Sequence, residues 1–356
     1  MRRERISPIG LDIGSRCVKA AQVALRAGGE AARVVAGACF ARLEPDTPVS
    51  AREMERVAGA LDRLGFAGRA CVASVDRASL ITAELELPPP GSGAPREQIA
   101  RLELARTHRR EPGGFEMGLW EVPAPARSGP GAHALAVACP HERAESILDA
   151  AHSAGLDVIA LDHPGCALAR LGAVAGGPTR AILDLGWSAG VLVLARGGAV
   201  LYERVIEGGS LNALHAGVAA HTGLEPGVVE TLLGDGAWSE IAGARRGEQL
   251  LDRTVRCVNE YADAVGRELK LSMDYLAHRF PAGAKEGASV GHVDLVGGGA
   301  ACAGVVERLA QRSGLELRAL RPSDVLGADA GVLPIASAPS LSLAVGLALR
   351  AGEGDA

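Results

Sequence analysis

The sequence is poor in aromatic residues, in lysine and in excess positive charge. Phenylalanine, tryptophan and tyrosine make up 3% of the 356 residues, which is too little for an aromatic cofactor-binding box. Only three of the 37 basic residues are lysines, and the formal net charge is −5. Because nucleic-acid binding needs a basic surface, this composition favours a protein that does not bind nucleic acid.

The sequence also lacks paired cysteine motifs and an apolar leader. Its seven cysteines are scattered and none is spaced Cys-x-x-Cys, which argues against a disulfide framework or zinc site and fits a reducing compartment. No apolar signal segment precedes the first predicted strand. Residues 330–349 carry no charge and could span a membrane by length, but their two prolines and three serines predict a loop and a short helix. We therefore expect a cytoplasmic protein.

The apolar content is large enough for more than one core. The chain is 48% hydrophobic and 22% charged, and its length favours two or more lobes. Apolar periodicity predicts alternating strands and helices, typical of an α/β protein. Predicted strands lie in residues 6–26, 69–74, 80–87, 156–161, 181–188, 190–195, 200–206 and 293–296, and predicted helices in 51–64, 97–110, 141–154, 210–221, 226–233, 249–278, 302–313 and 341–350.

One short phrase occurs twice. Residues 10–15 and 182–188 each form an apolar strand that ends in Asp-x-Gly, and a small hydroxyl residue and a second apolar strand follow. The two aspartates, Asp12 and Asp184, lie 184 − 12 = 172 residues apart. A glycine in such a hairpin lets the backbone approach a phosphate, whose oxygens the amide groups bind. The aspartate is suited to hold Mg²⁺ through water. Two facing hairpins would therefore hold a nucleotide's phosphates from both sides.

A third segment, Gly297, Gly298 and Gly299, follows a predicted strand and precedes a predicted helix, which suits a close approach to a nucleoside. The three segments occur in the order phosphate-1, phosphate-2, adenosine. This order resembles the actin, heat-shock chaperone and sugar-kinase fold. We therefore expect an α/β protein with the actin-like (ribonuclease H-like) two-lobed ATPase fold.

Within that superfamily the chain resembles the PilM family of type IV pilus and competence proteins, and next the cell-division actin FtsA. The resemblance lies in residues 8–15 followed by Val18 and Lys19, in 80–88, in 154–162 and in 344–350. It implies a first-lobe (1A) opening with the phosphate-1 hairpin in 1–33, an inserted 1C-like subdomain in 34–156 and a return to the first lobe in 157–180. The second lobe would be 181–335, and the first lobe's C-terminal helix and the tail 336–356.

The resemblance implies ATP and Mg²⁺ as ligands, with Asp12 and Asp184 on the metal. The nucleotide-binding residues would be Asp12, Gly14, Ser15, Arg16, Lys19, Asp184, Gly186, Trp187, Ser188, Gly208, Gly209, Arg267, Gly297, Gly298 and Gly299. The implied partner is the N-terminal cytoplasmic tail of a PilN-like inner-membrane protein, held between subdomains 1A and 1C, together with other pilus platform proteins. Membrane contact would be indirect, at the inner face of the cytoplasmic membrane, and self-association stays open.

Several residues depart from the family pattern. Arg16 and Ala189 replace a small residue and a hydroxyl, Trp187 is bulky, and the acidic and basic pair near the adenosine is reduced to Ala264, Gly266 and Arg267. No catalytic residue that orients an attacking water is assignable. We therefore expect a nucleotide-binding scaffold that is at most a slow ATPase.

Other functions stay open as alternatives. The same superfold includes small-metabolite kinases and FtsA-like filament proteins, and GspL-like secretion proteins are a further relative. FtsA ends in an amphipathic membrane helix, whereas residues 350–356 have no apolar face. None of the nine histidines forms a His-Glu-x-x-His zinc motif, and no Gly-x-Ser-x-Gly elbow supports a hydrolase.

Overall fold

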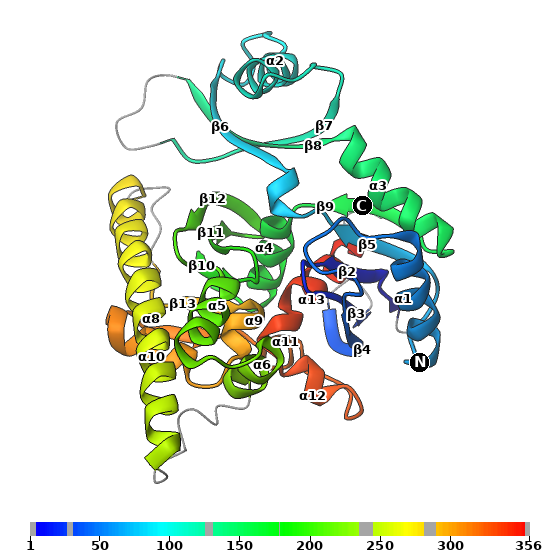
Figure 1. Cartoon of the computed structure of the whole chain (residues 1–356). Coiled ribbons are helices and arrows are strands. Elements are labelled where there is room, and N and C mark those ends of the chain that lie inside the picture. Colours follow the sequence, from blue (N-terminus) through cyan, green and yellow to red (C-terminus); the bar gives the residue numbers. More distant parts are fainter. Residues whose placement is uncertain are drawn as a thin grey trace.

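The computed structural model describes residues 5–26, 31–124, 131–177, 179–234, 245–280 and 290–352. These residues form two lobes, each built on a mixed sheet, and a smaller body above them (Figure 1). No helix in the described ranges combines the length and the apolar character needed to cross a membrane.

The first lobe contains a sheet in which a hairpin adjoins two parallel strands. Its strands are β2 (Ile9–Ile13), β3 (Cys17–Leu25), β4 (Ala31–Ala41), β5 (Ala70–Ser74) and β9 (Asp157–Asp162). They lie in the order β4-β3-β2-β5-β9, and the short β1 (Arg5–Ile6) also pairs with β3. Pairing is antiparallel on the β3 side of β2 and parallel on its β5 side.

The second lobe repeats this topology. Its strands are β10 (Arg180–Leu185), β11 (Gly190–Arg196), β12 (Ala199–Ile206), β13 (Val293–Val296) and β14 (Leu317–Ala319). Their order is β12-β11-β10-β13-β14. The pairs on the β11 side of β10 are antiparallel and those on its β13 side are parallel, as around β2 in the first lobe. The repeated Asp-x-Gly phrase is therefore part of a repeat of the whole sheet.

Helices cover the outer faces of the two sheets. In the first lobe α1 (Ala51–Arg63) buries Met54, Val57 and Leu61 at helical spacing, and it packs beside α3 (His141–Ser153). In the second lobe the cover consists of α5 (Leu211–Thr222), α6 (Pro226–Gly234), α8 (Arg245–Arg279) and α10 (Val305–Ser313). The remaining short elements are η1 (Arg77–Ser79), α9 (Gly297–Ala301), α11 (Pro322–Leu326), α12 (Leu333–Ala336), η2 (Pro339–Leu341) and η3 (Leu349–Gly352).

Two helices pack against each other between the lobes. They are α4 (Pro164–Val174), which contacts the second sheet, and α13 (Ser342–Ala348), which contacts the first. Glycine permits this close packing: a Cβ on Gly346 would lie 2.6 Å from the carbonyl carbon of Ala167, and one on Gly10 would lie 2.6 Å from the amide nitrogen of Ala348. The short helices in residues 333–348 confirm the prediction of a loop and a short helix there.

The smaller body is a three-stranded antiparallel sheet with one helix. Its strands are β6 (Ile81–Leu87), β7 (Phe115–Glu121) and β8 (Ala132–Pro140), in the order β6-β8-β7, and the helix is α2 (Arg96–His108). This body is shorter than the insertion of 34–156 expected from the sequence. β4, α1 and β5 belong to the first lobe, because β5 pairs with β2 and the apolar stripe of α1 packs in the same core.

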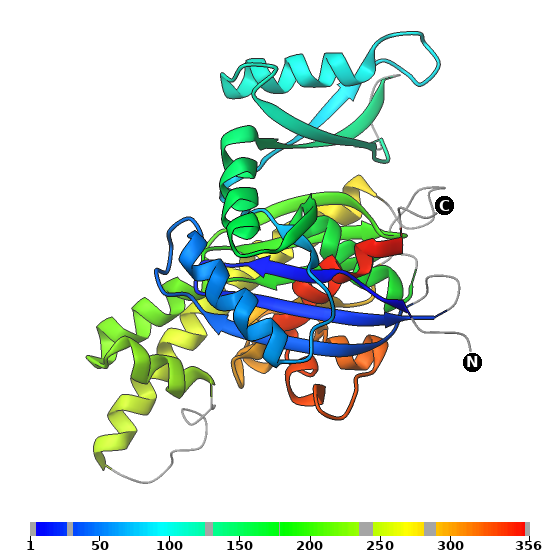
Figure 2. The same ribbon diagram turned by 90° about the vertical axis from the view of Figure 1, so that its right-hand side faces the viewer.

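The smaller body contacts the second lobe although its chain connections run to the first. The Trp120 indole N–H donates to the Val200 carbonyl at 2.7 Å, and Val122 and Leu135 pack with residues of β11 and β12. Arg279, at the end of α8, forms an ion pair with Glu84 of β6. The body therefore stands above both lobes (Figure 2).

Candidate functional site

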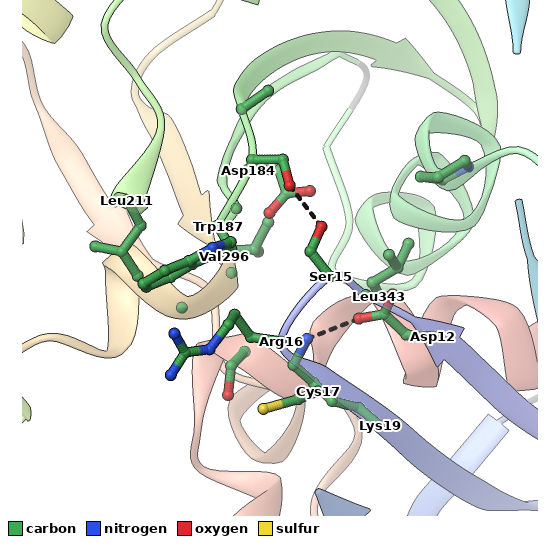
Figure 3. A pocket seen from close by; sticks show the side chains of 18 of the residues that line it. Asp12, Ser15, Arg16, Cys17, Lys19, Asp184, Trp187, Leu211, Val296 and Leu343 are labelled. Atoms are coloured by element: carbon green, nitrogen blue, oxygen red, sulfur yellow. Dashed lines mark hydrogen bonds and ion pairs between the residues drawn. The ribbon is translucent and has the colours of Figure 1, made fainter. Parts of the chain in front are cut away.

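A cavity of about 660 Å³ lies between the lobes. The ends of β2, β5, β10 and β13 reach it, together with α5, α6 and the C-terminal helices. Its volume is in the range of small-molecule and cofactor sites. Figure 3 shows side chains of both Asp-x-Gly hairpins pointing into this space.

The first hairpin places a buried charge pair at the cavity. Asp12 lies one residue before the end of β2, and Lys19 on β3 donates to its carboxylate at 2.9 Å. Burial alone would lower the pKa of Lys19, but the carboxylate outweighs burial and raises this pKa above its ordinary value. In the turn, the Gly14 N–H donates to the Cys17 carbonyl at 3.0 Å, and a Cβ on Gly14 would lie 3.0 Å from that oxygen. Glycine is thus needed for the tight turn.

The second hairpin repeats this turn. The Gly186 N–H donates to the Ala189 carbonyl at 3.1 Å, and a Cβ on Gly186 would lie 3.0 Å from that oxygen. Asp184 makes no ion pair or hydrogen bond with another described side chain. Burial raises the pKa of Asp184, and the nearby Asp12 adds to this increase. Two carboxylates therefore face one cavity, an arrangement that a divalent cation would stabilise.

The two hairpin tips touch each other across the cleft. Ser15 Oγ and Ser188 Oγ lie 2.5 Å apart. The Arg16 guanidinium lies 4.4 Å from the centre of the Trp187 ring and donates to Glu230 of α6 at 3.2 Å. The Trp187 ring also packs edge-on against His215 of α5, with centroids 5.0 Å apart. The first-lobe arginine is thus held by two side chains of the second lobe.

The glycine triplet lies directly after β13. Gly297 has φ of 84°, in the left-handed region that favours glycine, and a Cβ there would lie 2.8 Å from the Leu185 carbonyl oxygen. The sequence predicted a loop before a helix over 302–313, whereas the triplet itself forms the first turn of α9. Gly297 and Gly298 line the cavity beside the second hairpin.

The structure brings most of the sequence-predicted site residues to the cavity. Those that line it are Asp12, Gly14, Ser15, Arg16, Lys19, Asp184, Gly186, Trp187, Ser188, Gly297 and Gly298.

Four predicted residues lie away from the cavity lining. Gly208 and Gly209 pack against Ala264 and Gly190, and Gly299 packs against Leu185. Arg267 is exposed on α8. The three glycines thus allow close packing within the second lobe, and the structure gives Arg267 no contact with the cavity.

Sequence reasoning missed the residues that follow β5. The Ser74 hydroxyl accepts a hydrogen bond from the Ile13 N–H at 2.9 Å, and Asp76 and Arg77 also line the cavity. Asp76 is paired with Arg143. Ligands in α/β sheets bind at the carboxyl ends of parallel strands, and the parallel pairing of β5 with β2 is what brings these residues to the cavity. The sequence alone does not show that pairing.

Arg77 also forms a buried ionic contact between the lobes. Its guanidinium lies 2.5 Å from Glu203 of β12, and His163, which caps α4, lies 3.3 Å from the same carboxylate oxygen. Burial alone would raise the pKa of Glu203, but Arg77 and His163 together lower it to about 2. Within the described ranges, no group of three or more His, Cys, Asp or Glu side chains is arranged to hold a metal by itself.

The comparisons with known proteins support the fold. No family model and no curated protein matches the sequence. Among solved structures, the chain is similar to a PilM-PilN type IV pilus biogenesis complex, with a TM-score of 0.74 and 20% identity, over 98% of this chain and 99% of that one. It is also similar to the ethanolamine utilization protein EutJ from Carboxydothermus hydrogenoformans, with a TM-score of 0.52 and 14% identity, over 97% of this chain and 89% of that one. The chain has the actin-like ATPase fold, and the predicted resemblance to PilM is confirmed at the level of the fold.

Proposed function

We propose that this protein is a nucleotide-binding scaffold of a type IV pilus or related assembly platform. The observation that carries the proposal is the pair of Asp-x-Gly hairpins facing one cavity in a chain whose whole length follows the fold of PilM. The scaffold would bind ATP with Mg²⁺ between its lobes and the cytoplasmic tail of a PilN-like protein outside them. It would thereby sit at the inner face of the membrane through that partner.

The residues at the cavity fit a magnesium nucleotide. Asp12 and Asp184 would hold the cation through water, and Lys19, which pairs with Asp12 in the cavity wall, would bind a phosphate oxygen. The backbone amides of Gly14 and Gly186 close the two turns by bonding to Cys17 and Ala189, and phosphate oxygens would approach the tips of these turns. Gly297 and Gly298 would let the nucleoside approach β13. Mg²⁺ would supply charge neutralisation of the phosphates.

Calorimetry with and without Mg²⁺ tests this assignment. We expect Asp12→Asn to weaken Mg-ATP binding strongly and metal-free ATP binding little, because the carboxylate acts through the metal. Asp157→Asn is the matched control, since Asp157 is exposed on β9 and outside the cavity lining. Equal Mg-ATP affinity in the parent and in Asp12→Asn would contradict the assignment. If the parent binds no ATP, the proposal that the scaffold binds nucleotide is wrong.

The rate of ATP hydrolysis distinguishes the proposed scaffold from the alternative of a small-metabolite kinase. Asp76, the carboxylate of the newly found segment, already pairs with Arg143 and Ser79, so it is not free to orient a water. We expect phosphate release well below the median enzyme rate of roughly 10 s⁻¹. A rate at or above that median, above all one that depends on an added metabolite, would favour a small-metabolite kinase.

The smaller body is the proposed partner site. Its sheet has β8 in the centre, so β6 and β7 are edge strands to which an extended peptide can add by backbone hydrogen bonds. We propose that the PilN-like tail binds between this body and the first lobe, and that other platform proteins contact the assembly.

The partner test compares the full chain with a variant in which a short Gly-Ser linker replaces residues 81–140. Unlike removal of residues 34–156, this change leaves β4 and β5 in the first sheet and α1 packed in the first lobe. We expect the variant to melt cooperatively and to lose capture of candidate tail peptides in a polarisation assay. Unchanged capture by a folded variant would place the contact elsewhere.

A further inference from the structure

Two cysteines lie close together in the wall of the interlobe cavity. Cys17 begins β3, and Cys39 on β4 pairs with Lys19, so the two cysteines are diagonal neighbours on the same face of the sheet. Both line the cavity, and their side chains are close enough for each to shift the pKa of the other. Cys39 is exposed and Cys17 is half-buried, so a small oxidant can reach the pair from the cleft. Figure 3 shows Cys17 beside Arg16 and Lys19.

We propose that Cys17 and Cys39 are a peroxide-sensitive dithiol that closes reversibly into a disulfide in the wall of this cavity. A disulfide joins two sulfurs at about 2 Å, and Cys17 and Cys39 lie on two paired strands with their side chains on the same face. In proteins of reducing compartments, cysteine pairs that do form disulfides are usually transient and redox-sensing.

The surroundings favour Cys17 as the attacking group. The hydrogen bond from Cys39 lowers the pKa of Cys17 to about 6, although burial opposes this, and Lys19 and Arg16 assist. The same coupling raises the pKa of Cys39. The pair therefore favours a thiolate at Cys17 beside a thiol at Cys39, and the thiolate is the reactive form.

The surroundings of the other five cysteines raise the pKa of their thiols, in contrast to Cys17. Burial raises the pKa of Cys71 and of Cys166 to about 12 and that of Cys302 to about 11. Burial also raises the pKa values of Cys139 and Cys257. Their thiols stay protonated at neutral pH and react slowly, so oxidation should be selective for the cavity pair.

The chemistry balances with one peroxide. The Cys17 thiolate attacks a peroxide oxygen, the O–O bond breaks, and the product is Cys17 sulfenic acid with hydroxide, which takes up a proton to give water. The Cys39 sulfur then attacks the Cys17 sulfur, the S–O bond breaks, the S–S bond forms, and a second water leaves with the Cys39 proton. The two sulfurs lose two electrons, which the peroxide takes up. A dithiol reductant reverses the change.

The disulfide would change the cavity wall. It would join β3 to β4 and remove the Cys17 thiolate from beside Lys19. A resulting change in nucleotide affinity rests on the proposed function, whereas formation of the disulfide does not.

The test uses the reduced full-length protein and a stoichiometric amount of hydrogen peroxide. We expect two of the seven thiols to be lost, a Cys17–Cys39 linked peptide in mass spectrometry, and full recovery with dithiothreitol. Cys17→Ser should keep its six thiols under the same conditions. Cys39→Ser should accumulate sulfenic acid at Cys17, which dimedone traps.

Cys139→Ser is the matched control, because Cys139 is also half-buried but lies outside the cavity lining. This variant should lose two thiols as the parent does. The proposal is wrong if the parent keeps all seven thiols, if a different pair or an intermolecular link forms, or if Cys17→Ser also loses two thiols. None of these readouts depends on nucleotide binding, so failure of the proposed function would be seen separately.

Discussion

Glu203 on β12 is held ionised by Arg77 and His163, which lie outside its own sheet. Its carboxyl pKa is about 2 in the folded protein against an ordinary value of 4.5. Because the folded value is the lower one, the ionised carboxylate stabilises the fold fully above about pH 5, and this stabilisation is lost as the pH falls toward 2. A difference of this size corresponds to roughly 3 kcal/mol at most.

We therefore expect Glu203→Gln to lower the free energy of unfolding by about 1–3 kcal/mol at pH 7, and by progressively less at pH 4 and pH 3. Denaturant titrations of the parent and the variant at these three pH values measure this. Glu260→Gln, at an exposed position on α8, should change little at any of them. A loss of stability that is the same at pH 3 and pH 7 would show that the carboxylate's charge is not responsible.

At the scale of residues, the sequence predicted the cavity-lining residues that belong to the repeated phrase and missed others that line the same cavity. Asp12 and Asp184 could be found because each ends an apolar strand in the same phrase. Arg77 and Cys39 reach the cavity through strand pairing, which a single sequence does not display. Gly208, Gly209 and Gly299 were assigned to the ligand, but glycine also permits close packing, and sequence alone does not separate these two uses.

At the scale of elements, the packing of α13 against α4 depends on the absence of a side chain at Gly346. We expect Gly346→Ala to destabilise the protein by about 1–3 kcal/mol, because the new methyl would meet the backbone of Ala167, which cannot move without shifting α4. Thermal and denaturant unfolding measure this change.

Gly217→Ala provides the opposite case. Gly217 lies inside α5 with nothing near the position of a Cβ, so alanine there should stabilise the protein by about 0.5–1 kcal/mol through helix propensity. If the two variants changed stability in the same direction, the close packing at Gly346 would not be the cause.

Helices with a single buried face could be predicted from the sequence, because their apolar residues recur at helical spacing. A helix that is buried on more than one face could not. The stripe of α1 predicted its helix to within a residue or two. α4 was missed because its apolar residues face both the second sheet and α13, which leaves no periodic pattern. The extent of the smaller body was overestimated for a related reason: the pattern of β5 identifies a buried strand but does not say which sheet it joins.

At the scale of the whole molecule, Arg16 joins the lobes through Trp187 and Glu230. An exposed ion pair and a cation–π contact contribute up to about 1 kcal/mol each, so Arg16→Ala should favour separation of the hairpin tips by about tenfold. Amide hydrogen exchange of residues 185–190 should become faster by that factor.

Arg318→Ala is the control: it removes an exposed pair with Glu316, neither residue lines the cavity, and we expect this exchange to stay unchanged. High salt should bring the parent part of the way toward Arg16→Ala, since it screens the contact with Glu230. Unchanged exchange in Arg16→Ala would mean that the serine contact alone holds the tips together.

The smaller body grows out of the first lobe and rests on the second through Trp120 and Arg279. It therefore bridges the two lobes, and we expect a displacement of this body to change the angle between them. If the proposed partner binds this body and the proposed nucleotide binds the cavity, each should change the affinity for the other by the same factor, as the reciprocity of coupled binding requires. Two binding curves, each taken with and without the other ligand, measure that factor, and Trp120→Phe, which lacks the donor to Val200, should reduce it toward one.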